Sequence, residues 1–413
     1  MTKELKTTKV RLSTESKFLL SVGILFTIGN SIAATFITLF LVRLSGNDIV
    51  PALLQAMTNV VVLLISYIIG RNYLLTRYNI ISILRTGIIF TIIFYLVILI
   101  LQERAAPFIA VLGVFSGIGQ GFYWLSVNLL VGQVVKEYER GKYFSFQQTF
   151  GFLFSIIIPI VSGIVIASFS ELAGYYVLFT IAIIMFIASA FALKYVKGFK
   201  IEEKLNIVNV LKSKGNKYWS TNKWLWFKTS MFVVINTQIF IVFAFMIFGN
   251  EFYIGVLGSI MAAIGVVSSI WFANKININN QKFFYLLVSI VLLGLFITLA
   301  IFPSTAILIL AYLVLGVVSN WQMTMNQSLK YKLSSQITEH FKQEDYLVAV
   351  EFPIATGRIV GLSTALILVS ITEPFYAFRI LFVILSLIPM ASYLVISKKI
   401  DWFKKEVISD NIK

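Results

Sequence analysis

The chain has 413 residues, of which 59% are hydrophobic and 13% charged, and its 34 Lys and Arg exceed its 18 Asp and Glu, for a formal net charge of +16. Soluble domains contain roughly 25% charged residues and must cover their surface with polar groups, so this composition excludes a soluble fold and a disordered one. The chain has no cysteine, which excludes a disulfide scaffold.

Long apolar runs recur over the whole chain. A helix needs about 20 apolar residues to cross a hydrocarbon core about 30 Å thick. Twelve membrane-spanning helices are predicted, at Phe18–Val42, Ile49–Ile69, Ile80–Leu101, Ala106–Val131, Phe146–Ser168, Gly174–Leu193, Trp226–Phe248, Tyr253–Ala273, Phe283–Phe302, Thr305–Gln327, Leu347–Ile371 and Phe375–Ile396. The expected fold class is an all-α polytopic membrane protein.

The basic residues predict the orientation of these helices. Most of the 34 Lys and Arg fall outside the spans, on one side of the membrane. Arg43 and Arg104 fall on the other side. Because cytoplasmic loops collect Lys and Arg, we expect both termini to be cytoplasmic. This asymmetry also explains the net charge, so no nucleic-acid partner is expected.

A polar stretch at the middle of the chain divides the helices into six and six. We expect an N-terminal six-helix bundle at 1–193, a cytoplasmic linker at 194–224 and a C-terminal six-helix bundle with its tail at 225–413. Ser45–Asp48, after the first helix, resembles Phe248–Glu251, after the seventh, which indicates an internal repeat. Many secondary transporters are built from two such halves, with the substrate site between them.

Twelve helices in two parallel halves with cytoplasmic termini resemble the major facilitator superfamily (MFS). The loop that in this family reads Gly-x-x-x-Asp-Arg-x-Gly-Arg-Lys/Arg is here represented by Gly70, Arg71 and Arg77, without the acidic residue. The resemblance implies that these three residues form a gating loop. It also implies two pseudo-symmetric bundles that rock about a midplane cavity lined by helices 1, 4, 5, 7, 10 and 11.

Three further segments carry the resemblance. Ser155–Gly163, in the fifth helix, is similar to the glycine- and proline-containing pattern of family exporters, although it lacks most of the glycines. Gly119–Asn128 and Gly357–Gly361 resemble a branch of uncharacterised transporters from Gram-positive bacteria. The resemblance implies a carrier in a bacterial cytoplasmic membrane.

Amides and aromatic side chains recur inside the predicted spans, where polar groups are costly unless they face a cavity or another helix. They share a helical spacing on the fourth and tenth helices, and amides stand near the middle of the first and seventh. The candidate substrate-binding residues are Asn30, Gln120, Tyr123, Trp124, Asn128, Asn236, Gln238, Trp321, Gln322 and Asn326. Aromatic faces suit planar ligands and amides orient them, although buried amides also join helices and aromatic rings fill volume.

The eleventh predicted helix carries two charges. Glu351 is the only acidic residue well inside a predicted span, and Arg358 follows two turns later. Either charge would cost roughly 3 kcal/mol at the bilayer centre if unpaired, so we expect both to face the cavity. Glu351 is the candidate proton-coupling residue and Arg358 a candidate substrate-binding residue for an anionic group. Alternatively, Glu351 lies near the cytoplasmic mouth and pairs with a loop lysine.

These patterns predict a transporter and not an enzyme. One histidine, no cysteine and no carboxylate cluster give no metal site, and the chain has no Gly-rich phosphate loop for ATP, so no cofactor is expected. The expected function is proton-coupled efflux of small amphipathic or aromatic compounds. Uptake of a small solute or organic anion, or lipid translocation, is the alternative. The expected partners are the substrate, protons and membrane lipids, and the expected state is a monomer.

Overall fold

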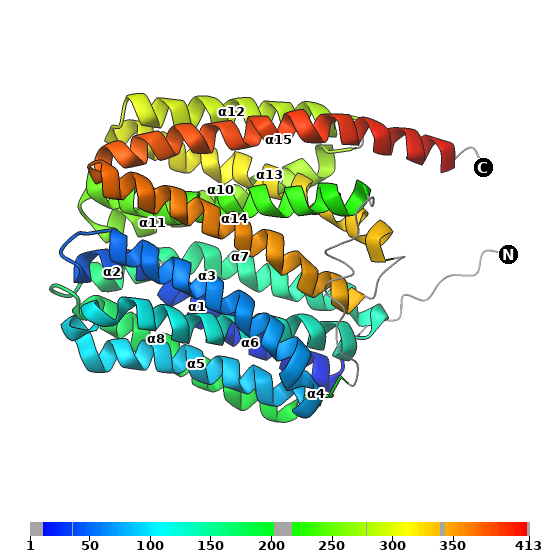
Figure 1. Cartoon of the computed structure of the whole chain (residues 1–413), viewed down its shortest axis with the longest axis horizontal. Helices are drawn as coiled ribbons and strands as arrows, with labels where there is room; N and C mark the ends of the chain where they lie inside the picture. Colours follow the sequence, from blue (N-terminus) through cyan, green and yellow to red (C-terminus); the bar gives the residue numbers. More distant parts are fainter. Residues whose placement is uncertain (1–10, 35, 202–216, 278, 339–342, 411–413) are drawn as a thin grey trace.

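The computed structural model describes residues 11–34, 36–201, 217–277, 279–338 and 343–410 (Figure 1). In these residues the regular elements are helices. The first half of the chain forms α1 (Thr14–Ala34), α2 (Ile37–Leu44), α3 (Val50–Ile69), the π-helix η1 (Gly70–Leu74), α4 (Leu75–Arg77), α5 (Ile80–Leu101), the 3₁₀-helix η2 (Gln102–Phe108), α6 (Ile109–Val134), α7 (Glu137–Ala167), α8 (Ala173–Ala192) and the 3₁₀-helix η3 (Leu193–Tyr195). The second half forms α10 (Lys217–Phe248), α11 (Glu251–Lys275), α12 (Gln281–Ile301), α13 (Thr305–Thr338), α14 (Gln343–Ile371) and α15 (Pro374–Asp410).

The described residues contain eleven continuous helical stretches that are long and apolar enough to cross a membrane. One of them, Ile80–Val134, contains both α5 and α6, joined by η2. Each of these two helices has more than the roughly 20 residues that one crossing needs. A long helix therefore lies at each of the twelve predicted positions, which confirms the predicted all-α membrane fold.

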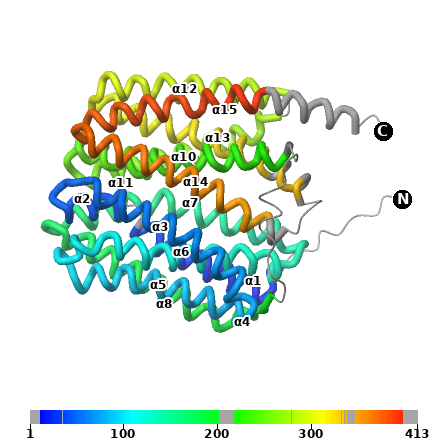
Figure 2. The backbone as a smooth tube through the Cα atoms, in the orientation of Figure 1, coloured from blue at the N-terminus to red at the C-terminus, as the bar shows by residue number. Residues whose placement is uncertain are grey.

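The helices pack as two groups that lie side by side (Figures 1 and 2). In the N-terminal half, α3 and α5 pack against α6, and α1 packs against α8. In the C-terminal half, α10 packs against α14, α12 against α15 and α11 against α13. The halves meet where α7 contacts α11, α3 contacts α14 and α2 contacts α10.

The two ends of the molecule differ. We call the end from which α15 projects the tail end, and the opposite end, where α2 finishes, the Arg43 end (Figure 1). With 37 residues at about 1.5 Å each, α15 is roughly 55 Å long and exceeds the hydrocarbon thickness. Part of α15 must therefore lie outside the hydrocarbon.

Glycine allows α6 to approach α3 closely. Three glycines stand four residues apart on one face of α6, at Gly113, Gly117 and Gly121. A Cβ atom added at any of them would lie 2.8 Å from a backbone carbonyl oxygen of α3; these carbonyls belong to Gln55, Asn59 and Leu63. Small residues at such an interface let two backbones pack directly, which is how helices associate in lipid.

The two segments that suggested an internal repeat share a glycine with a positive φ, although the residue after it differs: φ is 69° at Asn47 and −149° at Asn250. Gly46 has a φ of +67° and Gly249 a φ of +66°, in the left-handed region that glycine favours. Each glycine follows a helix at the Arg43 end, and a side chain then caps the next helix: Asp48 accepts a hydrogen bond from the backbone of Val50, and Asn250 from that of Phe252. The repeat is thus visible in the geometry of both turns.

Several helices extend beyond the predicted spans at the tail end. α7 begins at Glu137 and not near Phe146, and α10 begins at Lys217, so that residues 217–224 of the predicted linker are helical. Residues 202–216 of that linker lie outside the described residues. Hydropathy locates the part of a helix that crosses lipid, whereas the helix itself can continue into water.

Candidate functional site

A cavity of about 780 Å³ lies between the two halves. Its wall is built by residues of α1, α2, α3, α5, α6, α10, α13 and α14. Seven candidate residues from the sequence line it: Asn30, Gln120, Trp124, Asn128, Gln238, Glu351 and Arg358. Its volume falls within the range of about 300–1,000 Å³ that is typical of small-molecule sites.

Hydrogen bonds fix the amide and aromatic wall on the side of the N-terminal half. Gln120 donates to Asn30 over 3.0 Å, and its carbonyl oxygen accepts from the indole nitrogen of Trp124 at 2.9 Å. The side chain of Asn128 donates to the hydroxyl of Tyr67 over 3.4 Å. Trp124 keeps 42% of its surface exposed, so its ring is held in place and still presents a face to the cavity.

Sequence reasoning missed a second polar group on α3. Gln55 and Asn59 line the cavity, and both donate to the hydroxyl of Ser116 on α6, over 3.1 and 2.7 Å. The two amides stand four residues apart in an apolar span, which is the same signal that identified the α6 stripe.

Glu351 and Arg358 both line the cavity from α14. They are not within ion-pair distance of each other, and neither side chain makes a hydrogen bond to another described residue. Both are partly exposed. A carboxylate and a guanidinium that make no hydrogen bond or ion pair with the described residues of an apolar span require water or a ligand, because the alternative is a poorly compensated charge.

The remaining candidates lie outside the cavity lining. Tyr123 is buried in the N-terminal half, stacked on Phe26 with ring centroids 3.4 Å apart, and Asn236 is partly buried on α10. Trp321 stacks on Phe272 and donates to a backbone carbonyl of α11. Gln322 and Asn326 lie inside the C-terminal half.

The orientation of α13 about its own axis explains why Trp321, Gln322 and Asn326 do not line the cavity. Gln327, next to Asn326 in the sequence, lines the cavity together with Trp226 of α10. A step of one residue turns a helix by about 100°, so neighbouring positions face different partners.

The three residues of the predicted gating loop lie at the ends of short helices after α3. A Cβ atom added at Gly70 would lie 2.6 Å from a methyl group of Leu125, which shows that η1 packs tightly on α6. Arg71 is 2% exposed, whereas Arg77 is exposed at the end of α4. The loop is therefore packed within its own half of the molecule.

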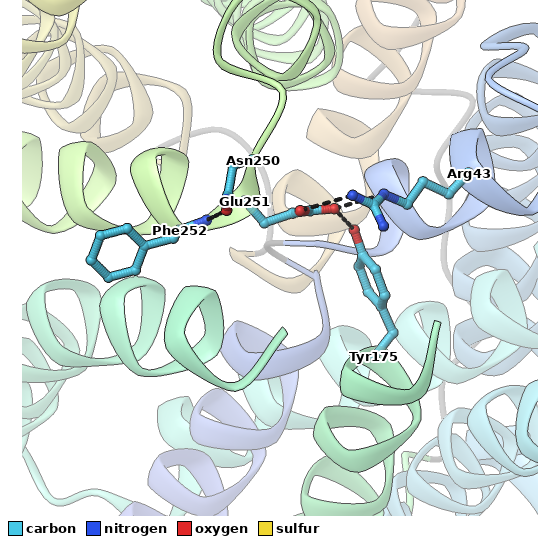
Figure 3. A network of polar contacts seen from close by, with 5 residues as sticks. All are labelled: Arg43, Tyr175, Asn250, Glu251 and Phe252. Atoms are coloured by element: carbon cyan, nitrogen blue, oxygen red, sulfur yellow. Dashed lines mark hydrogen bonds and ion pairs between the residues drawn. The ribbon is translucent and has the colours of Figure 1, made fainter. Parts of the chain in front are cut away.

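An ion pair joins the two halves at the Arg43 end (Figure 3). The guanidinium of Arg43 on α2 meets the carboxylate of Glu251 on α11 with nitrogen–oxygen distances of 2.8 and 3.1 Å. The hydroxyl of Tyr175 on α8 donates to the same carboxylate over 2.7 Å. The carboxylate is thus held from two helices of the opposite half, a contact that sequence reasoning missed.

Further contacts close the same end around this ion pair. Thr38 of α2 donates to Gln238 of α10 over 2.6 Å. On the other side of the interface, the backbone of α7 touches that of α11: a Cβ atom added at Gly255 would clash with the carbonyl oxygen of Pro159. Beyond the ion pair lies a second hollow of about 880 Å³, whose lining includes Arg43. Arg43 thus belongs both to the ion pair and to the wall of this outer hollow.

The halves part toward the tail end. Residues 144–149 of α7 are all exposed, and six consecutive residues cover more than one full helical turn. Among the described residues, no helix therefore packs closely around this part of α7, although the same helix touches α11 nearer the Arg43 end. The cavity is closed at the Arg43 end and opens toward the tail end.

Comparison with known proteins agrees with this architecture. The family model described as Major Facilitator Superfamily matches residues 16–338. The uncharacterized protein YqgE of Bacillus subtilis (strain 168) is 26% identical over 363 residues, which cover 86% of this chain and 83% of that protein.

Solved transporter structures share the fold. A bacterial homologue of the iron transporter ferroportin, in an inward-facing state, has a TM-score of 0.64 at 14% identity, with 92% of this chain and 98% of that chain covered. A POT family transporter in complex with a thioalcohol-conjugated peptide has a TM-score of 0.70 at 13% identity, with 93% of this chain and 96% of that chain covered.

Within the described residues of this chain, no group of three or more His, Cys, Asp and Glu could hold a metal ion.

Proposed function

Because the chain belongs to the Major Facilitator Superfamily and has the fold of membrane transporters, we propose that it is a secondary carrier that exports small amphipathic or aromatic compounds in exchange for protons. The observation that carries this proposal is the central cavity, which combines aromatic and amide walls with a single carboxylate, Glu351. The two halves would rock about this cavity and expose it to either side in turn.

The chemistry of the wall supports an amphipathic substrate. Trp124 and Trp226 provide aromatic faces on opposite halves, and Gln120 and Gln238 provide donors and acceptors. Such a wall binds a planar apolar body by stacking and orients it through a few hydrogen bonds. Since the cavity also holds one acidic and one basic side chain, it does not select strongly for a highly charged compound.

Glu351 is the proposed proton carrier. It lines the cavity and has no hydrogen-bond partner among the described residues, so it can exchange a proton with water when the cavity is open. A protonated carboxyl group tolerates an apolar, closed cavity better than a carboxylate does. Binding of a cationic substrate and binding of a proton would therefore compete at this position, as antiport requires.

The proposed orientation places the tail end in the cytoplasm. The segments at this end carry most of the Lys and Arg, and cytoplasmic segments collect these residues. The cavity described above would then open inward, ready to receive an internal compound. We further propose that the carrier works as a monomer in a bacterial cytoplasmic membrane and that the boundaries 1–193, 194–224 and 225–413 separate the two halves and their linker.

A second candidate function is transport of an organic anion or a lipid headgroup. Arg358 favours it, because this guanidinium faces the cavity and no carboxylate of the described part of the chain is within ion-pair distance of it. A guanidinium binds carboxylates and phosphates in a bidentate manner. Uptake and export would use the same site, since direction follows from the gradients and not from the wall.

The test is a flux assay in proteoliposomes that contain the purified protein and the fluorescent amphipathic cation ethidium. A pH gradient is imposed by dilution, and ethidium movement is followed with time. Glu351→Gln should lose at least tenfold of the gradient-driven rate while ethidium exchange without a gradient continues, because the amide cannot carry a proton. Glu137→Gln, a matched change at an exposed position at the start of α7, should retain both rates.

Gradient-driven ethidium transport at the normal rate in Glu351→Gln would reject the proton role. Transport of benzoate but not of ethidium, with the benzoate flux lost in Arg358→Ala, would favour the second candidate. Equal loss of all fluxes in Arg358→Ala would instead identify a structural role for this residue.

A further inference from the structure

Two lysines are buried inside the C-terminal half, and neither of them lines the central cavity. Lys228 of α10 and Lys330 of α13 are each 4% exposed. The two ammonium groups are close enough to repel each other, and within the described residues neither is in ion-pair distance of a carboxylate. A buried charge without an opposite charge is costly, so two of them in one place call for compensation.

The protein compensates these two charges only in part. The ammonium of Lys330 lies 3.5 Å from the centroid of the Trp226 ring, a favourable cation–π contact. Lys228 donates to the hydroxyl of Tyr285 over 3.4 Å, which is a long bond, and an ammonium group has three donors. The same ammonium lies 5.4 Å from the centroid of the Tyr285 ring, and at least two of its N–H groups have no hydrogen-bond acceptor among the described residues.

A small cavity adjoins Lys228. Its volume is about 20 Å³, and its wall is formed by Lys228, Thr229, Phe232, Gln322, Asn326, Ile388 and Ser392. A cavity needs roughly 10–15 Å³ to hold one water molecule, so this one holds a single particle of about that size. This volume suits a small ion better than a phosphate, a sulfate or an organic acid.

Lys228, Gln322 and Asn326 supply the donors around this cavity, whereas the hydroxyls of Thr229 and Ser392 can only accept. Tyr285 donates its hydroxyl hydrogen to the side-chain oxygen of Asn326, which leaves the amide NH₂ of Asn326 as the free group. Gln322 is 8% exposed and makes no hydrogen bond to another described residue. The hydroxyls of Thr229 and Ser392 are bonded to carbonyls of their own helices.

We infer that this cavity is a binding site for a single halide-sized anion, with chloride as the physiological ligand. The ammonium of Lys228 supplies the charge, and the amides of Gln322 and Asn326 supply neutral donors. An anion here would neutralise one of the two buried ammonium groups and satisfy N–H groups that are otherwise unpaired. The site joins α10, α13 and α15, so its occupation stabilises the C-terminal half as a unit. This inference does not depend on the proposed transport activity.

The test measures the melting temperature of the purified full-length protein in detergent. The protein is exchanged into sodium gluconate, and chloride or bromide then replaces gluconate at constant ionic strength. The melting temperature should rise with either halide and follow the saturation curve of one site, because a ligand that binds the folded state alone stabilises it by mass action. Sodium sulfate at the same ionic strength should produce no such rise.

Two variants and one control locate the effect. Lys228→Met should abolish the halide-dependent rise, and Gln322→Leu, which leaves all charges in place, should raise the half-saturating concentration about tenfold or more. Lys194→Met removes an exposed lysine of the other half and should behave like the unmodified protein. If Lys228→Met does not fold, Gln322→Leu alone decides the point in solution.

A crystal grown in sodium bromide gives an independent readout. An anomalous peak beside Lys228 would place the anion directly. Equal stabilisation by gluconate, sulfate and chloride would overturn the inference, as would a halide response that survives in both variants or an anomalous map without a peak at this position. Those results would mean that the cavity holds water and that one of the two lysines is uncharged.

Discussion

The ion pair between Arg43 and Glu251 should hold the carrier in the state described above. It bridges the halves at the closed end, so it must break when that end opens. Glu251→Gln removes the charge and keeps the size of the side chain. We expect this change to shift the equilibrium toward the state that is open at the Arg43 end.

The structure sets the size of the effect. The side chain of Glu251 is 4% exposed, whereas that of Arg43 is 29% exposed. Breaking a fully buried pair costs about 3–5 kcal/mol, and breaking an exposed pair costs about 0–1 kcal/mol. Because the guanidinium can regain water from the outer hollow, we expect about 1.4 kcal/mol, a roughly tenfold change in the ratio of the two states.

The chain has no cysteine, so spin labels can be attached at chosen positions. Ser170→Cys and Glu373→Cys place one label on an exposed loop of each half at the Arg43 end. Double electron–electron resonance on purified protein in detergent should resolve a shorter and a longer distance between the labels. The ratio of the longer to the shorter population should grow about tenfold in Glu251→Gln. The exchange of charges in the double variant Arg43→Glu/Glu251→Arg should reduce this ratio again.

A matched control is Glu103→Gln. This acidic residue lies at the same end, in the wall of the outer hollow, and makes no ion pair within the described residues. It should leave the distance distribution unchanged. An unchanged distribution in Glu251→Gln, or the same change in Glu103→Gln, would refute the role of the ion pair.

Two further predictions concern packing within the N-terminal half. Glu139 accepts hydrogen bonds from the backbone and hydroxyl of Ser13 and from the hydroxyl of Ser16, at 3.1, 3.2 and 2.7 Å. Glu139→Ala should therefore cost about 2 kcal/mol of stability and lower the melting temperature in detergent. An unchanged melting temperature would contradict this. Gly117→Val should prevent recovery of a monodisperse protein by size-exclusion chromatography, because the added Cβ would lie 2.8 Å from a backbone oxygen of α3. Gly132→Val, which has open space, should be tolerated, and equal yields of both variants would argue against close α3–α6 packing.

The membrane fold was predictable from the sequence because lipid imposes local rules. Each backbone group in the hydrocarbon must be bonded within its own helix, and each crossing needs about 20 apolar residues, so spans can be recognised one at a time. The same rules do not limit the parts of a helix in water. The start of α7 at Glu137 and the end of α15 at Asp410 were therefore not predictable from hydropathy.

The candidate site was predictable only where a stripe of residues happened to face the other half. Gln120, Trp124 and Asn128 do so. Tyr123, one step away on the same helix, is packed on Phe26 inside the N-terminal half. Sequence spacing shows which residues share a face of a helix, whereas packing against neighbours decides where that face points.

What the sequence by itself determined is thus the number, the length and the membrane environment of the helices, because these follow from the burial of apolar groups in lipid. Tertiary structure alone decided which polar groups meet. Arg43 and Glu251 are 208 residues apart, and Lys228 and Lys330 belong to different helices. The energies of such contacts depend on distance and on access to water, and neither is set by position along the chain.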